Sequence, residues 1–157
     1  MKNKIKFQIN TIEEEKQIVE MTRKDVDFFK EHKIKITWPE NTTVEKEYDR
    51  DKYQKELKKI KKEWEENNNN FLEKVTNFFD KDIGKVWIKV SAYGPMGFYD
   101  AETNTITINF NNNNPVQTIK HEIIHIMQEG FYKKEKPSYE SKEKGVNDVL
   151  STIEKDN

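Results

Sequence analysis

The chain has 157 residues and a mass of 18.9 kDa, which is the size of one domain. It contains no cysteine, which excludes disulfides, thiolate metal sites and thiol nucleophiles. Its 28 basic and 29 acidic residues nearly cancel, and only Arg23 and Arg50 are arginines, so we expect neither a nucleic-acid nor a membrane partner.

The first residues of the chain, 1–7, are basic but lead into polar residues rather than the apolar segment of a signal peptide. No apolar run approaches the roughly 20 residues that cross a bilayer. We therefore expect a cytoplasmic protein.

The first half of the chain predicts charged helices. Residues 12–35 and 43–66 each carry apolar side chains at helical spacing in a charged background. The asparagine tract 67–70 predicts a loop, and a third helix follows that ends near Gly84. We interpret the charged faces as solvated surface, and the lone His32 as a surface residue.

Two strands are predicted in the second half, because apolar and polar residues alternate over 86–90 and 105–110. Between them, residues 93–100 contain two glycines and a proline and predict a shaped loop. We expect the two strands to pair antiparallel through this loop, and the second asparagine tract, 111–114, to form another loop.

The clearest motif is an HExxH formed by His121, Glu122 and His125. It lies in a segment with Pro115 near its start and Gly130 at its end, a pattern typical of a helix. At about 100° per residue, the two histidines lie about 40° apart and one turn apart, so both can bind one metal ion. Glu122 lies beside them, off the chelating direction.

A catalytic zinc site needs a third protein ligand and keeps its fourth position for water. No third histidine follows the motif, and Gln128 replaces the glycine of HExxHxxGxxH, which excludes the metzincin pattern. Three ligands in a row on one straight helix cannot converge on one ion. The third ligand is therefore expected from the next helix.

That helix is predicted from Ser138, as its N-cap, to about Glu154. Its apolar side places Glu143 on the flank that faces the preceding helix, which makes Glu143 the first candidate for the third ligand. Glu140 is the next candidate. Asp148, Glu135 and the absence of a third ligand stay open.

With these residues, the sequence resembles the zincin metallopeptidases, and within them the gluzincins, in which a second helix supplies a glutamate after the HExxH helix. The spacing from His125 to Glu143 is close to that of thermolysin-like enzymes. Asn147 occupies the place where those enzymes carry an acidic group, so either Asn147 or Asp148 is expected to orient an imidazole, with Gln128 as another candidate. The resemblance covers about the last 75 residues and also includes short uncharacterised peptidases.

The resemblance implies one zinc ion held by His121, His125 and Glu143, with Glu122 as general base for the hydrolysis of a peptide or protein substrate. It also implies a second donor to the oxyanion, for which Tyr93, Tyr99, Tyr132 and Tyr139 are candidates. By the same analogy, strand 105–110 is expected to pair with an extended substrate through an exposed edge.

The sequence as a whole predicts an α+β fold over a single domain, 1–157. Residues 1–82 form charged helices of unassigned role, and residues 83–157 form a zincin-like catalytic part with a small antiparallel sheet, the HExxH helix and the ligand helix. Two other functions stay open. One is a metal-binding or protein-interaction module without catalysis, and the other is a regulatory protease specific for one partner protein, with the N-terminal region as lid, inhibitor or docking surface.

Overall fold

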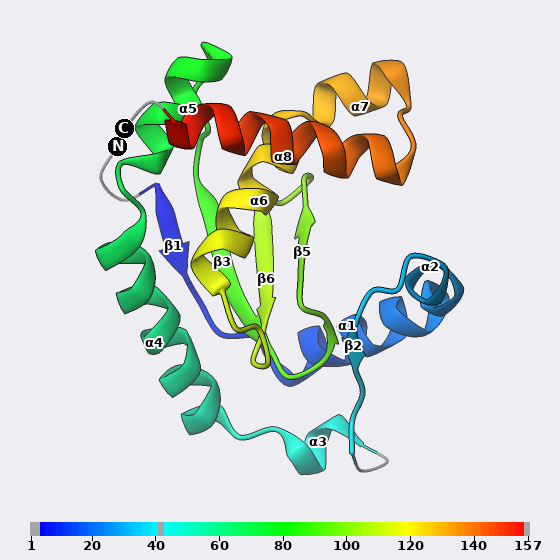
Figure 1. Cartoon of the computed structure of the whole chain (residues 1–157). Coiled ribbons are helices and arrows are strands. Elements are labelled where there is room, and N and C mark those ends of the chain that lie inside the picture. Colours follow the sequence, from blue (N-terminus) through cyan, green and yellow to red (C-terminus); the bar gives the residue numbers. More distant parts are fainter. Residues whose placement is uncertain (1–3, 41–42, 156–157) are drawn as a thin grey trace.

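The computed structural model describes residues 4–40 and 43–155, so the first three residues of the basic N-terminus lie outside it. The fold is α+β, as expected, and combines helices with a small mixed sheet and a two-stranded ribbon (Figure 1). The helices are α1 (Ile12–Lys24), α2 (Val26–Glu31), α3 (Val44–Glu47), α4 (Arg50–Asn67), α5 (Phe71–Phe79), α6 (Pro115–Met127), α7 (Glu129–Glu135) and α8 (Tyr139–Lys155). The strands are β1 (Ile5–Phe7), β2 (Ile36–Thr37), β3 (Val86–Ser91), β4 (Gly94–Pro95), β5 (Gly97–Asp100) and β6 (Thr105–Asn109).

The main sheet has the strand order β1-β3-β6-β5. Strands β3 and β6 pair parallel, with Ile88 opposite Ile106, which contradicts the antiparallel pairing predicted for them. The reason lies in the segment between them, which is not only a loop. It contains β5, which forms the antiparallel hairpin with β6, so the chain has already turned back before β6 begins.

Strand β6 is consequently an interior strand, and the predicted substrate-binding edge at residues 105–110 is wrong. The free edge on this side belongs to β5, which pairs only with β6 among the described strands. The ribbon of β2 and β4 is a separate antiparallel pair, in which Ile36 lies opposite Pro95.

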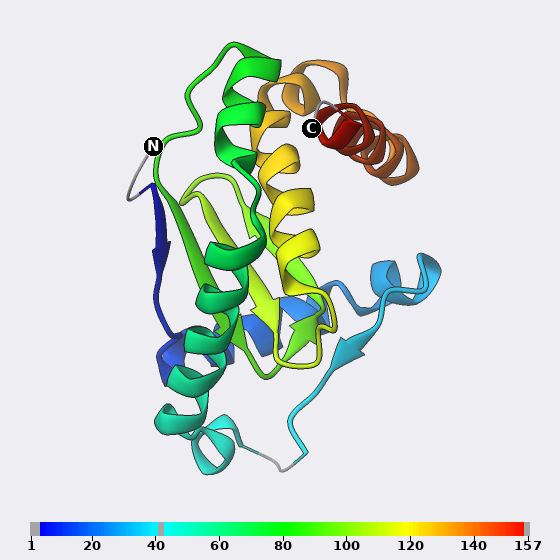
Figure 2. The same ribbon diagram turned by 60° about the vertical axis from the view of Figure 1, so that its left-hand side comes forward.

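The hydrophobic core lies between one face of the sheet and the helices that cover it, and the alternating apolar residues of the strands point into it. Helices α4 and α6 cover one face of the sheet, and α1 lies against the other (Figure 2). The side chains that β3 and β6 direct toward α4 and α6 are fully buried: Val86, Ile88, Val90, Ile106 and Ile108. Residues of the N-terminal half, among them Tyr53, Trp64 and Phe71, belong to the same core cluster. The two parts predicted from the sequence are therefore packed as one body.

Several helix boundaries differ from the prediction. The third helix, α5, ends at Phe79 rather than near Gly84. The helix expected over 12–35 is broken at Asp25, and the one expected over 43–66 restarts at Asp49, whose side chain caps α4 by accepting from the Asp51 and Lys52 amides. The HExxH helix ends at Met127 rather than at Gly130, because the chain bends at Gln128 into α7. The loop predicted at 67–70 is confirmed over 68–70, whereas Asn67 ends α4, and Asn69 and Asn70 take the left-handed backbone conformation.

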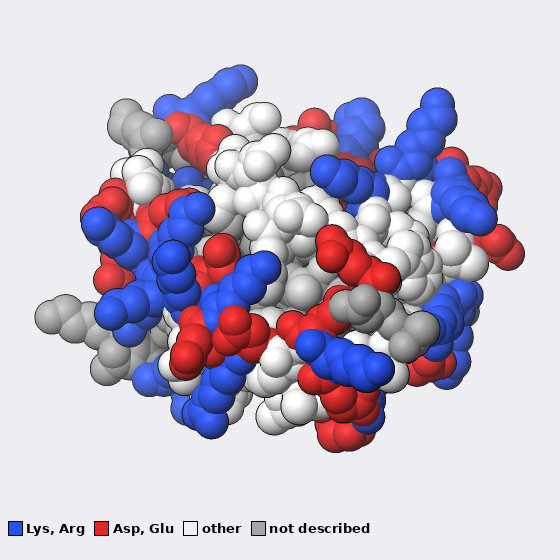
Figure 3. Space-filling view, turned by 90° about the horizontal axis from the view of Figure 1, so that it is seen from below, with Lys and Arg blue, Asp and Glu red and all other residues white. Residues whose placement is uncertain are grey.

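Charged side chains of both signs alternate over the surface around a central uncharged area on the face shown in Figure 3. Neither sign forms a continuous patch on that face. No helix in the described part of the chain is long and apolar enough to cross a membrane.

Candidate metal centre

Helix α6 brings the two motif histidines together. Pro115 occupies its first turn, and Ile119 and Ile123 are fully buried, which fixes the rotation of the helix. The Nε2 atoms of His121 and His125 lie 3.2 Å apart. The two imidazoles therefore converge from one stripe of the helix, as their spacing predicts.

Helix α8 supplies a carboxylate to the same point. The two oxygens of Glu143 lie 2.9 Å from His121 Nε2 and 2.8 Å from His125 Nε2. The helix is held against the core by the buried Val146, Val149 and Leu150. Of the candidates for a third ligand, Glu143 is the one that the structure places against both histidines.

The other candidates for a third ligand lie elsewhere. Glu140 pairs with His32, at 3.2 Å between the Glu140 carboxylate and His32 Nδ1. Asp148 is exposed and pairs with Lys144, and Glu135 is exposed on α7. His32 is not the surface residue predicted, because its side chain is only 15% exposed.

The three ligand residues fit a divalent metal ion in composition and in spacing. Zinc–nitrogen distances of about 2.0–2.1 Å and tetrahedral angles require ligand atoms about 3.3 Å apart. The 3.2 Å between the two Nε2 atoms matches this separation, and the 2.8 and 2.9 Å distances to Glu143 need only a shift of a few tenths of an ångström of its carboxylate. Two imidazoles and one carboxylate are ligands that zinc accepts.

The charges of these residues are already coupled without an ion. Burial alone would raise the pKa of Glu143, but the hydrogen bonds from His121 and His125 outweigh it and lower that pKa to about 2. Burial alone would lower the pKa of His121, because it disfavours the charged imidazolium. The hydrogen bond to Glu143 and the charge of Glu122 outweigh burial and raise that pKa. Protons and a metal cation therefore compete for the same atoms.

Glu122 is the second carboxylate of the site and is almost fully buried. One of its oxygens lies within 4.8 Å of the histidine nitrogens, farther away than the oxygens of Glu143. Burial raises the pKa of Glu122 to about 7, although the nearby His121 charge opposes the shift. A carboxyl group with such a pKa can accept and release a proton near neutral pH.

His125 is oriented by a residue that the sequence did not indicate for this role. Its Nδ1 lies 2.8 Å from the Tyr132 hydroxyl, which donates to Gln128 Oε1 at 3.1 Å. Because the hydroxyl proton goes to Gln128, Tyr132 accepts from Nδ1–H. The Nε2 proton that His125 donates to Glu143 is then the one that a metal ion would displace, which leaves the Nε2 lone pair for the metal. Gln128, one of the predicted candidates, thus acts through Tyr132.

Asn147 and Asp148, the other predicted orienting residues, are exposed on α8. Asp148 accepts from Lys144 at 3.0 Å, and neither side chain is brought to an imidazole. The prediction of an orienting role for these two residues is wrong, because the rotation of α8 that buries Val149 and Leu150 turns them toward solvent.

The tyrosines predicted as oxyanion donors have different surroundings. The Tyr99 ring stacks on His125, with ring centres 5.2 Å apart, and its hydroxyl donates to Glu129 at 3.1 Å. Tyr139 lies at the edge of the site against Phe28 and His32. Tyr93 packs with Ile18, Val19 and Val44 in a separate cluster and donates to Glu47, so it does not belong to the site.

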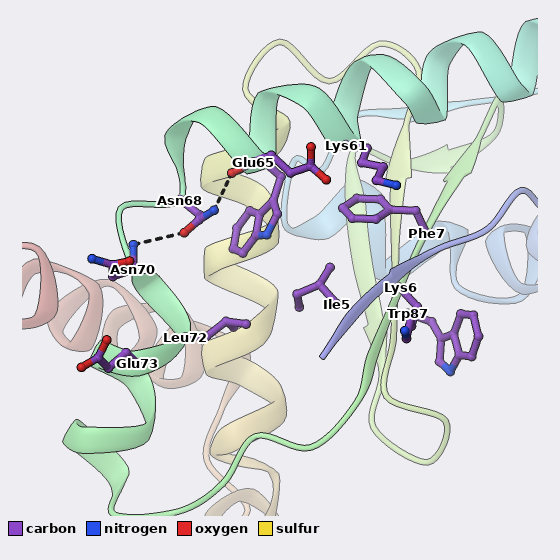
Figure 4. Close-up of a pocket in the computed structure, with 11 residues that line it drawn as sticks. Ile5, Lys6, Phe7, Lys61, Glu65, Asn68, Asn70, Leu72, Glu73 and Trp87 are labelled. Carbon is purple, nitrogen blue, oxygen red and sulfur yellow. Dashed lines mark hydrogen bonds between the residues drawn. The ribbon is translucent and has the colours of Figure 1, made fainter. Parts of the chain in front are cut away.

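The site opens into a groove of about 870 Å³. Its lining includes His121 and Glu122 of α6 and Glu143 of α8, together with residues of α1, α2 and β5. Glu122, which is buried, reaches this groove beside the histidines. Another pocket lies between β1, α4 and α5, where Lys61 stacks over Phe7 (Figure 4). Its lining includes none of the residues predicted for a site.

The sequence matches no protein-family model, and neither the curated proteins nor the solved structures contain a match.

Proposed function

We propose that this protein is a zinc-dependent peptidase. The observation that carries the proposal is the convergence of His121 Nε2, His125 Nε2 and Glu143 from two helices, at 2.8–3.2 Å from one another, at the wall of an open groove. A structural zinc site is closed by four protein ligands, whereas a catalytic site keeps one position for water and substrate. Three ligands beside a groove fit the second arrangement.

His121, His125 and Glu143 would hold the ion. When bound, zinc supplies a Lewis acid that polarises the substrate carbonyl and lowers the pKa of a water molecule. Tyr132 and Gln128 keep His125 in the tautomer that binds metal. The stacked Tyr99 ring restricts the imidazole from a third direction.

Glu122 is the proposed general base. Its carboxylate accepts a proton from the attacking water and passes that proton to the amine of the leaving product as the peptide bond breaks. Burial raises the pKa of Glu122 to about 7, at which the group can both accept and release a proton near neutral pH. The charge of a bound cation would lower that pKa. Structural metal sites need no such base, so Glu122 favours catalysis over a purely structural role.

The substrate is proposed to be an extended polypeptide that lies along β5. This strand has a free edge, and Gly97 to Asp100 all line the groove that contains the histidines. An edge strand presents unpaired backbone donors and acceptors to which an extended peptide can add. Strand β5, rather than the predicted strand 105–110, is thus the proposed site of pairing with an extended substrate.

Metal analysis tests the first half of the proposal. The purified protein should bind one zinc ion, and Glu143→Ala should weaken binding strongly, whereas Glu135→Gln, a control at an exposed glutamate of α7, should not. Equal zinc affinity in Glu143→Ala would remove Glu143 from the ligands.

Hydrolysis of a quenched-fluorescence peptide library tests the second half. Glu122→Gln should keep zinc but lose activity by about 10²-fold or more, the scale of a general base. His121→Ala should lose both zinc and activity. Full activity in a zinc-loaded Glu122→Gln protein would exclude Glu122 as the base, and a zinc-loaded wild type that cleaves no peptide would contradict the proposed function.

A further inference from the structure

The groove beside the metal centre has an apolar second wall. Met21 at the end of α1, Phe28 and Phe29 on α2, and Ile34 after α2 line this wall, and none of them belongs to α6 or α8. These residues come from the N-terminal half, in which the sequence singled out no residue for the site. The metal-binding residues and this wall therefore face the same space.

Phe28 is the exposed member of that wall. Its side chain is 39% exposed, whereas its neighbour Phe29 is 7% exposed and anchors α2. The Phe28 ring packs edge-on against Tyr139 and Phe29, at 5.2 and 5.9 Å between ring centres, and against His32 at 4.5 Å. An aromatic ring that is fixed from behind and open on one side offers apolar area at a small entropic cost.

The wall is tied to the ligand helix. His32 Nδ1 lies 3.2 Å from the carboxylate of Glu140, which precedes Glu143 by three residues on α8, and Tyr139 contacts both Phe28 and His32. The position of the Phe28 ring relative to the proposed metal is therefore set by direct contacts. A substrate side chain that meets Phe28 is held in register with the metal centre.

Charge gives the groove little selectivity. Apart from Glu122 and Glu143, its described lining residues include four acidic and three basic side chains, namely Asp25, Asp100, Glu102, Glu129, Lys35, Lys133 and Lys142. A segment of either charge meets both attraction and repulsion there. Apolar contact is the feature of the second wall that discriminates between side chains.

We infer that Phe28 is a specificity-determining residue and that the groove selects extended polypeptide segments carrying a large apolar side chain, which packs against Phe28. The inference rests on the proposed function only in taking a polypeptide as the ligand. It concerns binding, so it can be tested without hydrolysis.

The test measures peptide binding to the full-length, zinc-loaded Glu122→Gln protein. Fluorescent peptides of one Gly/Ser-rich sequence carry Phe, Leu, Lys or Glu at a single position. The Phe and Leu peptides should bind about tenfold more tightly than the Lys and Glu peptides, and an added Phe28→Ala substitution should abolish this difference. Phe28→Leu should retain most of it.

Phe131→Ala is the matched control, because Phe131 is a 57% exposed phenylalanine on α7 that does not line the groove. It should leave the preference unchanged. Equal binding of all four peptides, no binding of any, or an unchanged preference in both Phe28 variants would overturn the inference. Selective binding by a wild-type protein that cleaves nothing would instead contradict the proposed function and leave the inference standing.

Discussion

The hydroxyl of Tyr132 lies between His125 and Gln128, and its single proton serves Gln128. Burial raises the pKa of this hydroxyl, so it stays protonated over the range in which His125 would bind metal. If His125 binds a metal ion, Tyr132 takes the place that a carboxylate commonly has behind such a histidine, but without adding a negative charge. A site with Glu122 and Glu143 already holds two carboxylates.

Tyr132→Phe is expected to weaken zinc binding by about 10- to 100-fold, because His125 loses the acceptor that fixes its tautomer and orientation. Competition with a chromophoric chelator measures the change. Tyr93→Phe is the control, since it removes a hydrogen-bonded tyrosine hydroxyl of a separate cluster, one that donates to Glu47. Equal zinc affinities of the two variants would mean that Tyr132 does not orient the ligand.

The sequence placed His121, His125 and Glu143 but not Tyr132, and the difference has a physical cause. Spacing along one regular helix fixes which side chains share a face, and the apolar side of α8 fixes its rotation. Tyr132 lies seven residues beyond His125, after the bend at Gln128, so helical periodicity cannot be continued to it. Its contact with His125 depends on that bend.

At the level of elements, β5 is held against α6 because Gly97 has no side chain. A Cβ atom at Gly97 would lie 2.3 Å from the Thr118 methyl group on α6, too close for any real contact. Tyr99, two residues along β5 on the same face, stacks on His125. The position of the β5 edge relative to His121 and His125 thus depends on the close contact between Gly97 and Thr118.

Gly97→Ala is accordingly expected to destabilise the protein by about 1–3 kcal/mol, through overpacking, and to weaken zinc binding as β5 shifts. Gly145→Ala, in α8, should instead stabilise it by about 0.5–1 kcal/mol, because the nearest atom to its Cβ would be Gln128 Oε1 at 3.9 Å and alanine favours the helix. Thermal unfolding of both variants checks the two signs. A Gly97→Ala protein as stable as the wild type would refute this account of the α6–β5 contact.

Strand pairing was the part of the fold that the sequence did not reveal. Alternating residues located β3 and β6 and identified their buried sides, because that signal is local. Their parallel pairing depends on the short β5, whose glycine and two aromatics carry no clear alternation. Strand β1 pairs parallel with β3 across about 80 residues of chain, and three residues give no pattern to predict it.

Helix α1 is attached to the outer face of the sheet by an ion pair between Glu14 and the mostly buried Lys89. Partial burial would raise the pKa of Glu14, but hydrogen bonds from Lys89 and from the Thr11 backbone outweigh it and lower that pKa. A carboxyl group whose pKa is lower in the folded state stabilises the fold above its unfolded pKa, and this contribution is lost as pH falls.

Lys89→Met should therefore reduce the loss of stability between about pH 5 and pH 3. Without Lys89, the pKa of Glu14 in the folded state lies closer to its unfolded value, so protonation of Glu14 costs less stability. Urea unfolding at several pH values measures this slope. Lys144→Met is the control, because its partner Asp148 is exposed and the pair lies within one helix. The same slope in Lys89→Met and wild type would show that the ion pair does not contribute.

At the scale of the whole molecule, a buried carboxylate joins the two halves of the chain. Glu15 of α1 is fully buried and accepts from Tyr53 on α4, from Asn10, and from Ser91 and the Ala92 amide at the end of β3. Loss of its donors would leave a buried carboxylate unpaired, at a cost of several kcal/mol. The network therefore requires residues from both sides of position 82.

This arrangement bears on the idea that the N-terminal region is a removable lid. Deletion of residues 1–80 would remove β1 and α4, together with Tyr53, Trp64 and Phe71 from the main core. Truncation of one such aromatic alone costs about 3–5 kcal/mol, and a domain has about 5–15 kcal/mol in total. Fragment 81–157 is therefore expected to show no cooperative unfolding transition and little amide-exchange protection.

Regulation by the N-terminal half is better tested with the core intact. His32→Ala with Glu140→Gln removes the contact between His32, which follows α2, and Glu140 of α8, and leaves the core residues in place. If α2 restricts access to the groove, this double variant should cleave peptides faster than wild type, with unchanged zinc affinity and a similar melting temperature. A folded and active 81–157 fragment would contradict the shared core, because the sheet would then have to form without β1 and without α4.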